Sequence, residues 1–60
     1  MQQALNTYQF MRTQCAVNPV DACTDAAQFH GIPVADLAQA LISKGIAQGR
    51  DAQRLMLIAH

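Results

Sequence analysis

The amino-acid sequence predicts a small all-α fold, a single bundle of four short helices. Apolar residues recur at three- and four-residue spacing along most of the chain, which is the period of a helix with one buried face. Three breaks at proline or glycine divide the chain into four such segments. More than half of the residues are hydrophobic, which excludes disorder, and many of these are alanine, a strong helix former. Sixty residues suffice for one domain.

The first predicted helix covers residues 2–14. Its apolar stripe consists of Leu5, Tyr8, Met11 and Cys15. Phe10 lies beside this stripe and widens it. The helix is expected to end before Asn18-Pro19, because the residue before a proline is displaced from helical backbone angles.

The second predicted helix covers residues 19–30. Asn18 is a favourable N-cap, Pro19 a favourable first residue, and Asp21 places a negative charge where the helix dipole favours it. Gly31 supplies the left-handed residue that ends the helix. The apolar stripe consists of Val20, Cys23, Ala27 and His30.

The third predicted helix covers residues 33–44 and opens at Pro33. Lys44 complements the C-terminal end of the helix dipole, and Gly45 stops the helix. Ile46 stands where a Schellman motif places a hydrophobic contact, back onto Leu41. The apolar stripe consists of Val34, Leu37, Ala38 and Leu41, with Ile42 at its edge.

The fourth predicted helix covers residues 50–59, and Asp51 favours its start. Its apolar stripe consists of Ala52, Leu55, Met56 and Ala59. Leu57 and Ile58 extend the apolar surface nearly all round, and such a helix is buried on more than one side. The second side is covered either by another chain or by the first helix, and the sequence leaves both possibilities open.

The composition restricts the functional class. The formal net charge is zero, and glutamine occupies most polar positions. An alanine–glutamine face is easier to desolvate than a charged one and suits a contact surface, although glutamine is also simply a good helix former. No run approaches the ~20 apolar residues of a membrane span, and the N-terminus lacks the pattern of a secretory signal. We therefore expect no membrane association and a cytoplasmic location.

The two cysteines, Cys15 and Cys23, are expected to be free, buried thiols in that reducing compartment. The alternative is a disulfide between them, which requires their Cα atoms to approach within about 7 Å.

The titratable residues form no catalytic set, so we expect no enzymatic activity and no cofactor. Asp21 and Asp25 share a helix face, but nothing marks them as an acid/base pair. The cysteines, His30 and His60 match no zinc-binding pattern, so no metal site is expected. His30 stands just before Gly31 and is better explained as a cation stabilised by the C-terminal end of the helix dipole.

A motif spans the second and third helices. A small residue stands four positions before a glycine, an aliphatic residue follows the glycine, and apolar residues stand six and nine positions after it. These residues are Ala27, Gly31, Ile32, Leu37 and Ala40. The small residue lets two helices cross closely, and the glycine makes the turn. The stretch resembles the helix-turn-helix of Cro-like DNA-binding proteins, which implies that the third helix enters the major groove.

The same resemblance implies four DNA contacts. Gln39 lies on the helix that would read the bases and can bond adenine. Basic side chains near the far end of that helix could contact phosphate; they are Lys44, Arg50 and Arg54. A domain that neutralises many phosphates is usually basic, whereas this chain is neutral, although a dimer would double a small patch.

Residues 31–58 also resemble a ubiquitin-associated domain. The matching helical positions are Leu37, Ala40, Leu41, Ala52 and Leu55. The loop around Gly31 would correspond to the family's binding loop, with His30 in place of its methionine and Ile32 in place of its aromatic residue. This resemblance implies a compact three-helix bundle that binds a partner through the loop and the last helix.

We predict a non-enzymatic protein-interaction or regulatory module that binds a partner protein or a second copy of itself. The predicted contact residues are Phe10, Met11, Leu57 and Ile58. An apolar helical face in excess of what a small core needs is typical of an interaction site. The alternative is that all four residues belong to the core. The alternative function is a helix-turn-helix DNA-binding transcriptional regulator.

Overall fold

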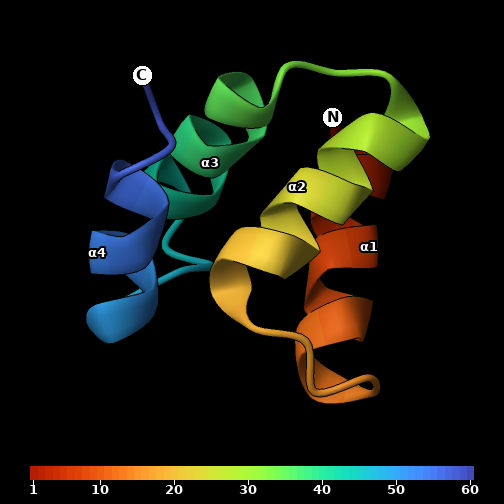
Figure 1. Ribbon diagram of the computed structural model, residues 1–60, viewed down its shortest axis with the longest axis horizontal. Helices are drawn as coiled ribbons and strands as arrows, with labels where there is room; N and C mark the ends of the chain where they lie inside the picture. Colours follow the sequence, from red (N-terminus) through yellow and green to blue (C-terminus); the bar gives the residue numbers. More distant parts are fainter.

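The computed structural model describes all 60 residues and contains four helices and no strand. The helices are α1 (Gln2–Thr13), α2 (Pro19–His30), α3 (Val34–Ser43) and α4 (Arg50–Met56). Helix α2 packs against all three others, whereas α1 and α4 lie on opposite sides of the molecule and make no backbone contact (Figure 1). The prediction of an all-α bundle of four short helices is therefore confirmed.

The start and end of α2 match the predicted helix. The side-chain oxygen of Asn18 accepts a hydrogen bond from the backbone N–H of Asp21 at 2.9 Å, and Pro19 is the first helical residue. Gly31 adopts the left-handed conformation (φ +68°) that the sequence predicted. The backbone N–H of Ile32 then donates to the carbonyl oxygen of Ala27 at 2.9 Å, which satisfies a carbonyl of the last turn.

The end of α3 shows the Schellman pattern. The N–H of Ile46 donates to the carbonyl oxygen of Leu41 at 3.0 Å, and Ile46 packs against the core. The helix is one residue shorter at each end than predicted. Pro33 has extended backbone angles and precedes the helix, and Lys44 is its C-cap.

The end of the last helix differs from the prediction. Helix α4 ends at Met56 rather than at Ala59. The N–H groups of Leu57 and Ile58 donate three residues back, to the carbonyl oxygens of Arg54 and Leu55, so the chain tightens into turns instead of continuing the helix. In this segment Leu57 is exposed, while Ile58 packs against the core.

The core is built from small side chains and a few leucines. Both phenylalanines lie outside it: Phe10 is 58% exposed and Phe29 is 80% exposed. The core lines the inner faces of all four helices and comprises Ala4, Leu5, Tyr8, Ala22, Cys23, Ala26, Ala27, Leu37, Ala38, Leu41, Ala47 and Leu55. Helix α2 contributes only alanines and Cys23 to this cluster, which lets the neighbouring helices approach closely.

The two cysteines have different environments, and both are free. The prediction that Cys15 is buried is wrong, because α1 ends at Thr13 and Cys15 lies in the exposed connection that follows. Cys23 is buried as predicted, and burial raises the pKa of its thiol to about 11.

We expect a thiol reagent at about pH 8 to modify Cys15 rapidly in the folded protein and to modify Cys23 only when the chain is unfolded, because the reactive species is an accessible thiolate. Counting reacted thiols with and without denaturant measures this difference. Equal reaction rates for the two cysteines in the folded protein would contradict the burial of Cys23.

Candidate functional site

Four residues of α4 and of the turn after it form one surface, which we call the α4 outer face: Arg50, Gln53, Arg54 and Leu57. Their spacing places them along one side of the helix. They line a shallow depression of about 490 Å³. Leu57 is 75% exposed, and neither arginine takes part in the single salt bridge of the molecule.

The predicted contact residues lie on α1 and on the end of the α4 segment, whose helical backbones do not meet. Phe10 is exposed and, two residues after the buried Tyr8, points away from the core side of α1. Met11 is half-buried and packs against the core, as does Ile58. Leu57 lies on the α4 outer face, and the structure brings no backbone of α4 against α1. The four residues therefore do not form one continuous surface.

The predicted DNA contacts are divided between two helices. Gln39 donates its side-chain amide to the carbonyl oxygen of Ala59 at 2.6 Å, so the C-terminal segment engages it. Lys44 is exposed at the end of α3. Arg50 and Arg54 lie together on the α4 outer face.

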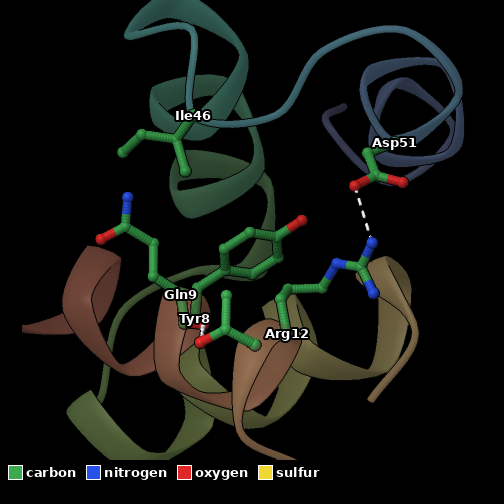
Figure 2. Close-up of a pocket in the computed structure, with 6 residues that line it drawn as sticks. Tyr8, Gln9, Arg12, Ile46 and Asp51 are labelled. Atoms are coloured by element: carbon green, nitrogen blue, oxygen red, sulfur yellow. Dashed lines mark hydrogen bonds and ion pairs between the residues drawn. The ribbon is translucent and has the colours of Figure 1, made fainter. Parts of the chain in front are cut away.

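A second hollow lies between α1 on one side and the α3–α4 connection with the start of α4 on the other, and we call it the Tyr8 cleft (Figure 2). It has a volume of about 490 Å³ and is lined by Tyr8, Gln9, Arg12, Thr13, Ile46 and Asp51. Side chains from α1 form one wall, and Ile46 and Asp51 approach from the opposite side.

Arg12 holds three segments together at the edge of this cleft. Its Nη2 donates to Oδ2 of Asp51 at 2.8 Å, and its Nη1 donates to the carbonyl oxygen of Val17 at 2.9 Å. The hydrogen bond to Asp51 raises the pKa of Arg12, which keeps the guanidinium charged. Both side chains are about a third exposed, so the ion pair contributes at most ~1 kcal/mol to stability.

Tyr8 is the most unusual residue of the cleft. It is 2% exposed, and its enclosed hydroxyl is the only buried side-chain polar atom without a partner in full hydrogen-bond geometry, the Arg12 guanidinium being its nearby polar neighbour. Burial raises the pKa of Tyr8 and the charge of Asp51 raises it further, whereas the charge of Arg12 and a weak hydrogen bond from its guanidinium lower it. The hydroxyl is therefore protonated at neutral pH and is a potential donor. Figure 2 shows it on the side of the ring that faces Asp51.

No pattern in the sequence indicates this cleft. Tyr8 fits the apolar stripe of α1, and Arg12 and Asp51 are 39 positions apart in the chain. No local pattern indicates that such residues meet, since only the packing of the helices brings them together.

His30 has a specific partner in addition to its place at the end of α2. Its Nε2 lies 2.7 Å from Oγ1 of Thr7, which joins α2 to α1. No group of three histidine, cysteine or acidic side chains converges on a common point.

No family model, curated protein or solved structure matches this chain. None of its helices is long and apolar enough to cross a membrane.

Proposed function

We propose that this chain is a non-enzymatic interaction module that binds another protein chain, either a partner or a second copy of itself, through the α4 outer face around Leu57. The observation that carries this proposal is the exposure of Leu57, which is 75% accessible beside the 57% accessible Met56. Large apolar side chains gathered on a protein surface are typical of interaction sites. We place the module in the cytoplasm, where its two free thiols stay reduced.

The distribution of apolar residues in the whole chain supports the same function. The core is built mainly from alanine and leucine, while two large apolar side chains at the end of α4, Met56 and Leu57, are left exposed. A chain of 60 residues has few large apolar side chains to place, so their position outside the core favours contact with another surface. The zero net charge favours a protein surface over a polyanion.

Replacing Leu57 by aspartate should abolish the association without unfolding the chain, because Leu57 lies outside the core. Measurement of the molar mass in solution over a range of protein concentrations tests self-association. We expect the mass of the wild-type protein to rise with concentration at both low and high salt, because apolar contacts are not screened. The mass of the Leu57→Asp variant should stay that of a monomer.

A matched control is Phe10→Asp, which introduces the same charge at an exposed apolar position on α1. It should leave the association at the α4 outer face intact. A wild-type protein that is monomeric at every concentration would exclude the second copy as the partner. If Leu57→Asp also leaves the binding of any other protein unchanged, the α4 outer face is not the interaction site.

Nucleic acid is the second candidate partner, and the observation that favours it is the pair of exposed, unpaired arginines on the α4 outer face, Arg50 and Arg54. In this case the affinity for duplex DNA should fall steeply with salt concentration, and Arg54→Gln should reduce that salt dependence. Salt-independent association that is lost in Leu57→Asp would favour the protein partner instead.

A further inference from the structure

We propose that the α4 outer face binds a second copy of this chain, on the exposed side of its helix α2. This side of α2 is formed by Asp21, Asp25 and Phe29, and we call it the α2 outer face. The second copy is one of the two partners that the proposed function leaves open, and this assignment rests on that function. The contact joins two different surfaces of the protein, so it is heterologous.

The α2 outer face is a stripe of two acidic residues and one aromatic residue. Asp21, Asp25 and Phe29 follow one another at four-residue spacing, which makes them neighbours along one side of the helix. All three are exposed, and the opposite side of α2 enters the core. At 80%, Phe29 has the highest exposed fraction of any large apolar side chain in the molecule.

The α4 outer face has the same order of residues with the opposite charge. Arg50 and Arg54 are four residues apart, and Leu57 follows three residues later. Four residues rise ~6 Å along a helix, so the two arginines are spaced like the two aspartates of α2. When α2 of one copy lies parallel to α4 of another, each aspartate faces an arginine and Phe29 meets Leu57. The antiparallel alignment would place Leu57 against an aspartate.

The charges on both faces have no ion-pair partner within the chain. The single salt bridge joins Arg12 to Asp51, so the two aspartates of α2 and the two arginines of the α4 outer face are left without one. The side-chain amide of Asn18 donates to Oδ2 of Asp21 at 2.8 Å, which leaves the negative charge of the carboxylate in place. Like charges four residues apart on a helix repel each other. Contact between the two faces would offset both repulsions.

No other helix offers an equivalent partner surface. Helix α1 exposes Phe10, but its only charged residue is Arg12, which is already paired with Asp51. Helix α3 carries one charged residue, Asp36, and exposes no large apolar side chain. Two α4 outer faces would bring like charges together, which disfavours their contact. Charge complementarity therefore selects α2 as the partner of α4.

The apolar and charged residues have different roles in this contact. Exposed ion pairs contribute little affinity each, whereas Phe29 and Leu57 are the two most exposed large apolar side chains of the chain. Opposite charges across an interface mainly fix the alignment and exclude wrong partners. Loss of either apolar side chain should therefore abolish the association, and reversal of one charge should only weaken it.

Two variants that each damage one face test the proposal. Leu57→Asp damages the α4 outer face and leaves the α2 outer face intact, whereas Phe29→Asp does the reverse. Each variant alone should have the molar mass of a monomer at concentrations where the wild-type protein associates. An equimolar mixture should contain a dimer with one copy of each variant, because one intact α4 outer face then meets one intact α2 outer face. Circular dichroism checks that both variants keep their helices.

An exchange of charges tests the parallel alignment. Arg54→Glu and Asp25→Arg should each weaken self-association by roughly three- to tenfold, because an exposed ion pair becomes a contact between like charges. A mixture of the two variants should recover the wild-type affinity, since the exchanged charges then meet in opposite sign. Lys44→Glu is the control, because it reverses an exposed charge outside both faces and should leave the association unchanged.

The outcomes separate this proposal from the proposed function. A wild-type chain that stays monomeric at every concentration, or a mixture of Leu57→Asp and Phe29→Asp that stays monomeric, would overturn the assignment of α2 as the partner. If Leu57→Asp abolishes association while Phe29→Asp associates like the wild type, the α4 outer face is an interaction site that meets a different surface. If Leu57→Asp associates like the wild type, both the assignment and the site of self-association proposed above are wrong.

Discussion

Replacing Leu55 by alanine should remove most of the stability of this domain. Leu55 is completely buried and is the only leucine that α4 contributes to the core. Truncation of a buried leucine to alanine costs about 2–5 kcal/mol, through lost burial and the cavity left behind. A domain of this size rarely has more than ~3–5 kcal/mol in total. Urea unfolding followed by circular dichroism should therefore show a variant that is largely unfolded before denaturant is added.

Leu57→Ala provides the control for this prediction. It removes the same atoms two residues later in the chain, but Leu57 is 75% exposed. At protein concentrations too low for association, its free energy of unfolding should change by less than ~0.5 kcal/mol. A loss at Leu57 comparable with that at Leu55 would show that the Leu57 side chain is enclosed within the monomer.

Replacing Gly49 by alanine should produce the second largest effect, for a purely backbone reason. Gly49 is the N-cap of α4 and has φ +61° and ψ −126°, a combination that residues with a Cβ atom rarely adopt. An added Cβ at this position would meet no other atom within 4 Å, so steric contact with neighbours does not contribute. Backbone strain of this kind costs about 1–3 kcal/mol, and thermal unfolding should show the corresponding fall in Tm.

Gly31→Asn is the matched test of that explanation. Gly31 also has a positive φ and open space around its Cα, but its ψ of +34° places it in the left-handed helical region. Asparagine tolerates that region better than other residues with a Cβ atom, so we expect a loss below ~1 kcal/mol. Equal losses at the two glycines would show that the value of ψ at Gly49 is not what matters.

The sequence predicted the elements whose ends depend on local chemistry. The bounds of α2 follow from Asn18, Pro19 and Gly31, which act within one turn of the helix ends that they define. The end of α3 follows in the same way from Gly45 and Ile46. These signals depend on neighbouring residues, so they can be interpreted before the tertiary structure is known.

The features that the sequence did not predict depend on contacts between distant segments. Nothing near Leu57 and Ile58 indicates that the chain would leave the helix after Met56. The apolar pattern placed Phe10 beside the buried stripe, whereas the packing of α1 turns it towards solvent. Tyr8 was placed correctly on the buried face, but the enclosure of its hydroxyl without a partner in full hydrogen-bond geometry depends on how α1 packs against the α3–α4 connection.

The small side chains on the inner face of α2 limit which amino-acid substitutions this protein can tolerate. Ala22, Ala26 and Ala27 are fully buried, and α2 touches each of the other helices. There is little volume to remove at these positions, and any larger residue would force all the surrounding helices outwards together. Sequence variation that preserves this fold should therefore concentrate on the outer surfaces of α1, α3 and α4, and the centre of α2 should admit only glycine, alanine, serine or cysteine.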